Sequence, residues 1–196
     1  MVDTTPARAA GTVRQRLLDA AEELFYGHGI SSTGVDAVIE QAGVATGSLY
    51  KNFAGKDGLV EAYLDRREER WRAHWDACVQ AEDDPVERVL AIFTAVESWD
   101  PRATADRGCA FVAASVQLPE GHAGTRAVLD HTRNLTARLA QLCAPLQPDD
   151  PDHLDELVQD LLLLYEGMIS VGALQLDRGG PERARRLARA RLDAEH

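Results

Sequence analysis

The segment GVATGSLYKNFAGKDGL, residues 43–59, concentrates hydrogen-bond donors in a short stretch of chain. Only Val44, Leu49 and Phe53 offer obvious core side chains. The positions around them carry small or polar residues: Gly47, Ser48, Tyr50, Lys51, Asn52 and Lys56. Hydroxyl, amide and ammonium groups that face outward from a short helix suit contacts with the phosphates and base edges of duplex nucleic acid.

Helical spacing separates the apolar anchors from the donors. Leu49 and Phe53 are four residues apart, so a helix over about residues 46–53 places both on one face, toward a core. The remaining side chains then project elsewhere: Thr46, Gly47, Ser48, Tyr50, Lys51 and Asn52. This face suits insertion into a major groove with its N-terminal end near the bases, and Gly47 allows the backbone to approach closely.

Each of these residues also has an ordinary structural explanation. Tyr50 fits a half-buried packing position, and Gly47 fits a close contact between helices. Lys51 and Lys56 fit solvated positions on any surface. As a set, with Leu49 and Phe53 turned inward, the four residues favour DNA binding over these separate explanations.

Two helices are predicted before this one. The stretch TVRQRLLDAAEELFYGHG opens with Thr12 and Gln15 in a capping-box pattern and ends in glycines. In the next stretch, Thr33 is predicted to cap GVDAVIEQA, and Gly43 ends that helix in a turn that needs a positive φ. Two short helices joined by such a turn form a helix-turn-helix layout.

The stretch from about residue 14 to residue 63 resembles the TetR family of transcriptional regulators. The resemblance depends on the order of its segments: FYGHGI at the end of the first helix, then Thr33, AGV, GSLYKNF and KDGL. Members of this family combine a DNA-binding head with a helical ligand-binding body that dimerises. The resemblance therefore implies three partners, which are double-stranded operator DNA, a small-molecule inducer and a second copy of the chain.

The resemblance also implies roles for eight residues. Four match positions that usually hold the phosphate backbone: Thr33, Ser48, Tyr50 and Lys56. Four match positions that face base edges: Thr46, Gly47, Lys51 and Asn52. Asn52 is suited to adenine, and Lys51 to guanine or a phosphate. Arg8 and Arg14 are candidates for a neighbouring phosphate or the minor groove.

Three positions depart from the family pattern. Ala45 stands where a capping Ser or Thr is frequent, which leaves Thr46 as the cap or leaves the helix frayed. Ile39 replaces a small residue that faces the turn. Thr46 replaces a common Lys or Arg, and this removes one positive charge from the surface that is expected to meet DNA.

The whole chain is typical of an all-α fold, with a three-helix head and a C-terminal helical bundle. Further helices are predicted over residues 57–80, 85–99, 107–118, 121–142, 151–176 and 181–192. The shift in composition near residue 57 predicts three parts: a flexible N-terminal arm at 1–11, a helix-turn-helix DNA-binding domain at 12–56, and a ligand-binding and dimerisation domain at 57–196.

The predicted body contains aromatic residues suited to an apolar pocket. The candidate ligand-binding residues are Trp71, Trp75, Phe93, Trp99, Phe111, Tyr165 and Met168. Each is also compatible with plain core packing. We expect a largely apolar inducer, and Glu97 and Glu166 offer negative partners should the ligand be a cation.

The segment LDELVQDLLLLYEGMISVGALQL is apolar on most sides, and such a helix needs burial on more than one face. Together with the helix at 181–192 it is expected to form a homodimer interface through about residues 151–192, as the TetR resemblance implies. The alternative is a core helix that is buried within a single copy.

The net charge of −11 argues against nucleic acid in general, but the charge is unevenly distributed. Residues 1–58 hold five basic and seven acidic side chains, whereas residues 59–196 hold 16 basic and 25 acidic ones. Charge alone therefore leaves DNA binding by the first part open without supporting it.

Several other classes of function lack support. No run of about 18 apolar residues and no signal-peptide core are present, so we expect a cytoplasmic protein without a membrane partner. No catalytic motif or phosphate-binding glycine loop is visible, so neither an enzyme activity nor a cofactor is expected. The histidines lack paired spacing on one helix, which argues against a metal site. The three cysteines are predicted to be buried thiols: Cys78, Cys109 and Cys143.

These observations lead to a primary hypothesis and an alternative. We expect a homodimeric transcriptional regulator, a repressor that a small molecule releases from a pseudo-palindromic operator. The alternative, motivated by the net acidity and by Thr46, is a helical small-molecule-binding or catalytic bundle that no longer binds DNA. Salt-sensitive retention of specific DNA separates the two.

Overall fold

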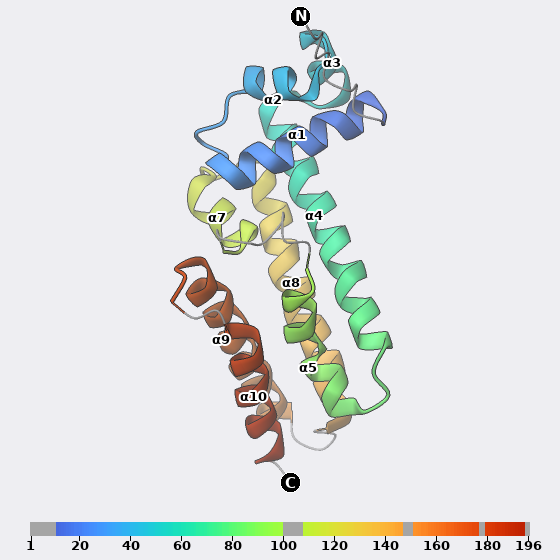
Figure 1. The fold of residues 1–196 in the computed structure, drawn as a ribbon, viewed down its shortest axis with the longest axis vertical. Coiled ribbons are helices and arrows are strands. Elements are labelled where there is room, and N and C mark those ends of the chain that lie inside the picture. The colour runs from blue at the N-terminus through green and yellow to red at the C-terminus, as the bar shows by residue number, and fades with distance from the viewer. Residues whose placement is uncertain (1–10, 100–107, 147–150, 177–178, 195–196) are drawn as a thin grey trace, which may run out of the picture. The chain divides into compact units, whose positions relative to one another are not determined.

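The computed structural model describes residues 11–99, 108–146, 151–176 and 179–194. Within these ranges the chain is helical and contains no strand, which confirms the expected all-α fold class (Figure 1). The helices are α1 (Val13–His28), α2 (Val35–Ala42), α3 (Thr46–Asn52), α4 (Gly55–Gln80), α5 (Pro85–Glu97), α7 (Ala110–Gln117), α8 (Gly124–Cys143), the 3₁₀ turn η1 (Ala144–Leu146), α9 (Pro151–Ala173) and α10 (Gly180–Asp193). No helix in these described ranges is both long enough and apolar enough to cross a membrane.

The chain divides into two compact units. The head unit comprises Met1–Arg66 and Ala113–Ala127, and the body unit comprises Arg67–Val112 and Val128–His196. Three helices, α4, α7 and α8, contribute residues to both units. The predicted flexible arm lies almost entirely outside the described residues, and the predicted boundary at residue 57 stays a prediction.

The head unit is built around α1, which contacts both α2 and α3 (Figure 1). Its N-terminus has the predicted capping box, because Gln15 N donates to Thr12 Oγ1 at 3.2 Å and Thr12 N donates to Gln15 Oε1 at 2.8 Å. Farther along α1, the buried Phe25 ring meets Tyr63 of α4 edge to face, with the ring centroids 5.7 Å apart. The apolar stripe of α1 therefore forms the centre of the head core.

The prediction that Thr33 caps α2 is wrong. The N-cap is Gly34, which makes no side-chain capping bond. Thr33 is buried, and its hydroxyl lies 2.8 Å from Gly29 O and 3.3 Å from Leu24 O at the end of α1. The hydroxyl therefore fastens the α1–α2 loop to the end of α1. Its acceptors lie four and nine residues earlier in the chain, where a pattern for capping α2 does not point.

The turn between α2 and α3 has the predicted geometry. Gly43 adopts the left-handed conformation with φ 60° and ψ 43°. Arg16 of α1 donates from Nη1 to Ala42 O and Gly43 O, each at 3.3 Å. Glycine adopts this left-handed conformation without steric strain, and the Arg16 guanidinium stabilises the turn by binding its carbonyl oxygens.

The head half of α4 is attached to α1 by one arginine. Arg66 Nη1 lies 2.7 Å from Asp19 Oδ1, and Arg66 Nη2 lies 2.7 Å from both Glu22 Oε2 and Leu18 O. A planar guanidinium satisfies two carboxylates and a carbonyl together, which fixes its geometry more tightly than a single surface ion pair.

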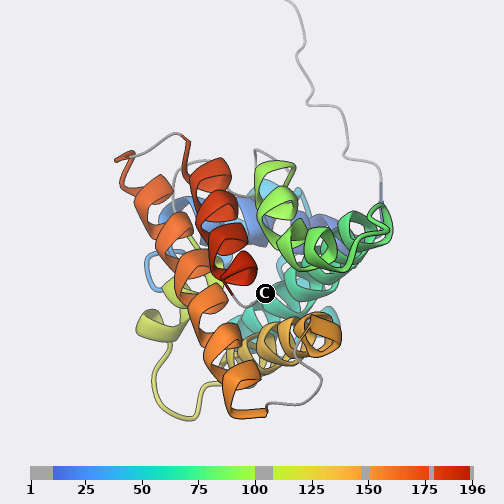
Figure 2. The same cartoon turned by 90° about the horizontal axis from the view of Figure 1, so that it is seen from below.

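The body unit has its core among α4, α5, α8, α9 and α10. Helix α10 contacts both α9 and α5, and it lies between them in Figure 2. Arg185 and Arg189 on α10 bind the two carboxylate oxygens of Glu87 on α5, and Arg191 Nε binds Asp160 Oδ2 on α9 at 2.6 Å. These ion pairs orient a helix whose small buried face includes Ala184 and Ala188.

Several helix ends differ from the sequence prediction by a few residues. Helix α4 begins at Gly55 rather than at 57, α5 ends at Glu97 rather than at 99, and α9 ends at Ala173 rather than at 176. Helix α8 begins at Gly124 rather than at 121, because Gly121 has a positive φ of 78°. The predicted helix at 107–118 is described from residue 108 onward, and α7 begins within it at Ala110.

Candidate nucleic-acid interface and body cavity

Helix α3 has one buried face and one exposed face. Leu49 is fully buried, and Phe53, which caps the C-terminus of α3, is 7% exposed. The opposite side, which we call the α3 outer face, consists of the exposed residues Thr46, Gly47, Tyr50, Lys51 and Asn52. Tyr50 is 62% exposed, so it does not serve as a packing residue of the head.

Gly47 is not required by packing within the head. A methyl group added at this position meets no described atom within 4 Å, so the glycine does not permit any close contact between helices. Its φ lies outside the left-handed region, so the backbone conformation does not demand glycine either. The absence of a side chain here leaves a stretch of helix backbone accessible from outside.

Ser48 and Asn52 are linked along the helix. Asn52 Nδ2 donates to Ser48 O at 2.8 Å, while Ser48 itself is half-buried. This bond uses one amide hydrogen of Asn52 and leaves its second amide hydrogen and its carbonyl oxygen for an external partner. The N-cap position of α3 is Ala45, without a side-chain capping bond, so Thr46 does not cap the helix.

The other two predicted phosphate contacts lie outside α3. Lys56 is half-buried in the first turn of α4. Thr33 is buried with its hydroxyl proton engaged inside the head, so a phosphate contact by this hydroxyl would require its internal bond to break. Both roles stay predictions.

Two arginines of α1 border α3. The Arg14 guanidinium lies 4.6 Å from the centroid of the Phe53 ring. This cation–π contact keeps a positive charge beside the C-terminal end of α3. Arg8, the other arginine predicted to approach DNA, lies outside the described residues. Sequence reasoning missed Arg16, whose partners on the α2–α3 turn are 26 and 27 residues away.

The body unit contains a cavity of about 760 Å³. Five of the seven predicted ligand-binding residues line it: Trp71, Trp99, Phe111, Tyr165 and Met168. The Trp71 ring meets Trp99 edge to face at 5.4 Å and lies 6.1 Å from Tyr165. The other two do not line it: Phe93 is fully buried in the core, and Trp75 lines a different cavity. All seven ligand-binding roles stay predictions.

The lining of the body cavity also includes polar residues that the pocket prediction did not name. Arg67, Cys109, His131 and Glu182 join Glu97 on its wall. Cys109 and Cys78 are only partly buried, contrary to the expectation of three buried thiols, and Cys143 alone is fully buried. Of the polar wall residues, Arg67, Glu97, His131 and Glu182 come from four different helices and Cys109 directly precedes α7, so their convergence depends on tertiary packing rather than on any local motif.

The pKa of His131 is raised by its surroundings. Burial lowers its pKa, but the Cys109 and Glu68 side chains raise it, and the net pKa is about 9. Its Nδ1 lies 2.5 Å from Glu68 Oε2, and its ring stacks on Phe111 at 3.7 Å between centroids. Burial raises the pKa of Glu68 while the hydrogen bond from His131 lowers it, and the pKa is lowered overall. Both directions indicate an ion pair at neutral pH.

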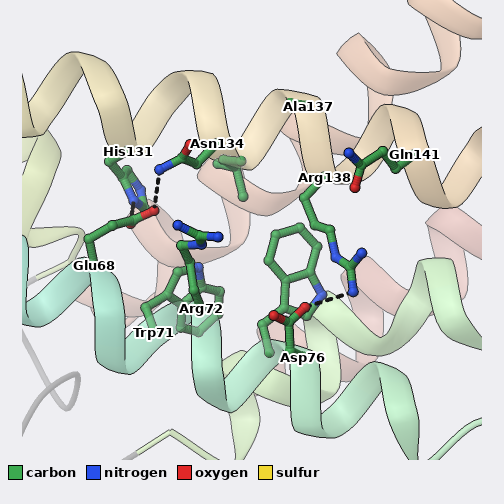
Figure 3. A pocket seen from close by; sticks show the side chains of 11 residues that line it. Glu68, Trp71, Arg72, Asp76, His131, Asn134, Ala137, Arg138 and Gln141 are labelled. Carbon is green, nitrogen blue, oxygen red and sulfur yellow. Dashed lines mark hydrogen bonds and ion pairs between the residues drawn. The ribbon is translucent and has the colours of Figure 1, made fainter.

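A second, smaller cavity of about 190 Å³ is lined by residues of α4 and α8, and Figure 3 shows its side chains facing one another from the two helices. Asn134 Nδ2 donates to Glu68 Oε1 at 3.0 Å, and Arg138 Nη2 pairs with Asp76 Oδ1 at 2.7 Å. We call it the α4–α8 cavity. It shares Trp71 and His131 with the body cavity.

The C-terminal helices expose a set of large apolar side chains. Leu163 of α9 is 74% exposed, and three further leucines of α10 and of the segment after α9 are at least half exposed: Leu174, Leu176 and Leu187. Exposed large apolar side chains of this kind are candidates for contact with another molecule.

Comparisons with known proteins agree with this architecture. The family model described as bacterial regulatory proteins, tetR family, matches residues 17–63, which cover α1 to the first turns of α4. The HTH-type transcriptional repressor ComR of Escherichia coli K12 is 34% identical over 97 residues, which are 49% of this chain and 46% of ComR. The regulator SrpR of Pseudomonas putida is 40% identical over 68 residues, 35% of this chain and 32% of SrpR. The chain thus spans less than half the length of these two curated relatives.

A solved structure extends the similarity over nearly the whole chain. SCO4454, a TetR-family transcriptional regulator from Streptomyces coelicolor, is 28% identical, and the match covers 97% of this chain and 89% of that one with a TM-score of 0.76. A putative TetR transcriptional regulator from Streptomyces avermitilis is 29% identical with a TM-score of 0.71, covering 86% and 90% of the two chains. Residues 17–63 of the chain thus match the tetR-family model, and over most of its length the chain is similar to solved TetR-family regulators.

Proposed function

We propose that the protein is a DNA-binding transcriptional regulator and that the α3 outer face contacts operator DNA. The carrying observation is Gly47, since its backbone is exposed among the donors of Thr46, Tyr50 and Lys51 although no packing contact requires a glycine. An accessible helix backbone flanked by donors suits close docking into a major groove. The family comparisons support a regulator rather than an enzyme.

The proposal includes a homodimer that binds two half-sites. The exposed leucines at 163, 174, 176 and 187 support an interface through about residues 151–192, because a second copy would remove them from water. A symmetric dimer presents two copies of α3, and successive major grooves on one side of DNA are roughly 34–36 Å apart. The operator would accordingly be pseudo-palindromic.

The proposal also assigns a ligand to the body cavity. Its volume of about 760 Å³ and its walls of Trp71, Trp99, Phe111 and Tyr165 suit a largely apolar small molecule. Helix α4 contributes to both units without interruption, so a ligand that favours one setting of α4 would alter DNA affinity. By thermodynamic linkage, DNA must weaken ligand binding by the same factor. A regulator that its ligand releases from operator DNA in this way acts as a repressor.

The test is fluorescence anisotropy with duplex DNA from upstream of the protein's own gene, at a low and a high salt concentration. Wild-type protein should bind specifically and lose affinity steeply as salt rises, because each phosphate contact releases counterions. A Tyr50→Ala/Lys51→Ala variant should lose specific binding while it stays folded and dimeric.

The matched control is Arg133→Ala, which removes a positive charge from an exposed position of α8 in the body unit. It should leave DNA affinity unchanged. Equal loss of binding in the control and in the α3 variant would show that general charge, rather than the α3 outer face, determines affinity, and the proposal would then fail.

A further inference from the structure

The N-terminal end of α3 carries residues that are expected to meet the bases, but it lacks a buried anchor of its own. The two anchors of α3 come later, with Leu49 at the middle of the helix and Phe53 at its C-cap. In the described stretch Gly43–Ser48 no residue is fully buried, and the N-cap Ala45 makes no side-chain capping bond. A helix of seven residues has little stability in isolation, so contacts from outside α3 must set the direction of this end.

The turn before α3 is bound to α1 through one arginine. Within the turn, Gly43 N and Val44 N donate to carbonyl oxygens of the last turn of α2, at 3.0 and 3.3 Å. The neighbouring carbonyl oxygens of Ala42 and Gly43 instead accept from Arg16 Nη1, each at 3.3 Å. One guanidinium therefore ties both the end of α2 and the turn to α1.

Arg16 is suited to holding backbone in place. It is half-buried, and its Nη1 atom meets two carbonyl oxygens rather than a carboxylate. A hydrogen bond from a charged donor is stronger than one between neutral groups, and the planar guanidinium has a fixed geometry. Without this side chain, water would have to satisfy the two carbonyls, and the turn would be free to change its angle to α1.

Helix α1 contacts the α3 segment at both ends. Two residues before Arg16, the Arg14 guanidinium lies 4.6 Å from the centroid of the Phe53 ring, at the C-terminal end of α3. Arg16 binds the turn before its N-terminal end. We propose that Arg16 is a positioning residue for DNA recognition, which holds the α2–α3 turn against α1 and thereby sets the angle at which Thr46 and Gly47 meet the base edges. The inference rests on the proposed function, because it requires α3 to contact DNA.

Positioning and a direct phosphate contact have different effects on specificity. A phosphate contact carries no sequence information, so its loss weakens binding to every duplex by a similar factor. A partly unfolded sample also loses apparent affinity for every duplex equally. A loss of positioning weakens mainly the contacts with base edges, which only the specific duplex supplies. The ratio of the affinities for specific and unrelated DNA therefore isolates the positioning role.

The experiment measures, by fluorescence anisotropy at one salt concentration, the binding of the full chain to two duplexes of equal length. One duplex comes from upstream of the protein's own gene, and the other has an unrelated sequence. Arg16→Met should weaken binding to the specific duplex about tenfold or more, because base contacts are misplaced. Binding to the unrelated duplex should weaken by no more than about threefold, because only a charge is lost. The ratio of the two affinities should fall accordingly.

Arg126→Met is the matched control, because Arg126 is an exposed arginine of the head unit that pairs with Glu61 of α4. It should leave both affinities at their wild-type values. Thermal unfolding confirms that each variant is folded. Arg16→Gln is the second variant should Arg16→Met unfold, because its amide is readily hydrated and its shorter side chain ends before the two carbonyls. The same fall in the ratio is expected.

An equal loss of affinity for both duplexes would overturn the inference, because it would assign Arg16 to a phosphate contact or to folding alone. An equal fall in the ratio for Arg126→Met would overturn it as well, in favour of general charge. Wild-type protein without specific binding would overturn the proposed function and this inference together. Wild-type specificity with an unchanged ratio in the Arg16 variant would overturn this inference alone.

Discussion

At the scale of single residues, Gly47 separates a structural role from a binding role. A methyl group at this position meets no described atom within 4 Å, so Gly47→Ala should leave the free energy of unfolding unchanged or raise it by up to about 1 kcal/mol, since alanine favours helix. DNA affinity should nevertheless fall about tenfold or more, because the methyl group would occupy space next to the groove. Urea unfolding and DNA anisotropy on the same sample measure both quantities.

Gly27→Ala on α1 is the control, because its added methyl group also meets no described atom but lies away from the α3 outer face. It should leave DNA affinity at the wild-type value. A Gly47→Ala protein that binds DNA as tightly as wild type would contradict the close approach of this backbone.

The ion pair between His131 and Glu68 predicts a specific dependence of stability on pH. The folded-state pKa of His131, about 9, lies above the unfolded value of about 6.5. Its stabilisation is therefore complete below pH 6.5 and is lost as the pH rises toward 9, by an amount on the order of 1–3 kcal/mol. His131→Gln should remove this part of the slope.

Urea titrations at fixed protein concentration across this pH range measure the effect, because the stability of a dimer depends on concentration. Glu68→Gln should also reduce the slope, since it removes one of the groups that raise the pKa of His131. A wild-type stability that stays flat from pH 6.5 to 9 would show that the ring is not charged in the folded protein.

At the scale of helices, features that depend on neighbouring residues could be predicted from the sequence, whereas contacts between residues far apart in the chain could not. The capping box of α1, the left-handed Gly43 and the inward faces of Leu49 and Phe53 depend on residues within four positions of each other, and the structure has all of them. Thr33 was misassigned as a cap because its hydroxyl binds α1 carbonyls across the loop.

The candidate body cavity shows the same limit. Five of the seven residues that the sequence singled out line this cavity, whereas Phe93 and Trp75 do not, because helical spacing does not show which side of a helix faces a cavity. His131 and Arg138 on α8 meet residues of α4 such as Glu68, which is 63 residues before His131 in the chain. This pairing depends on how the two helices are aligned, and the hydrophobic periodicity of each helix does not specify that alignment.

The turn between α2 and α3 should be sensitive to its backbone conformation. Gly43 has φ 60°, so Gly43→Ala should lower the free energy of unfolding by about 1–2 kcal/mol, the usual cost of a left-handed residue with a side chain. Gly43→Asn should cost less, because asparagine tolerates this region. Urea unfolding checks the order, and equal stability of the alanine and asparagine variants would argue against a left-handed turn.

At the scale of the whole molecule, the exposed leucines of the C-terminal helices predict self-association. Leu163→Glu should convert a dimer into a monomer, because a charge at a position that would become buried pays a desolvation cost. Analytical ultracentrifugation measures the change. Leu129→Glu, on α8 and 51% exposed, is the matched control and should remain dimeric.

A monomeric wild-type protein, or a Leu163→Glu variant that remains dimeric, would place the interface elsewhere. The account also predicts that Leu163→Glu weakens operator binding although residue 163 is far from α3 in the chain, because a dimer engages two half-sites at once.

The central claim, that the α3 outer face meets DNA, is tested most directly by photo-crosslinking. Tyr50 is replaced by photoreactive benzoylphenylalanine, and in a second protein Val116, which is 81% exposed in the same head unit, is replaced in the same way. Both proteins are irradiated on duplex DNA that they bind with equal affinity. The account predicts a covalent DNA adduct from position 50 and none from position 116, whereas an adduct from position 116 without one from position 50 would contradict it.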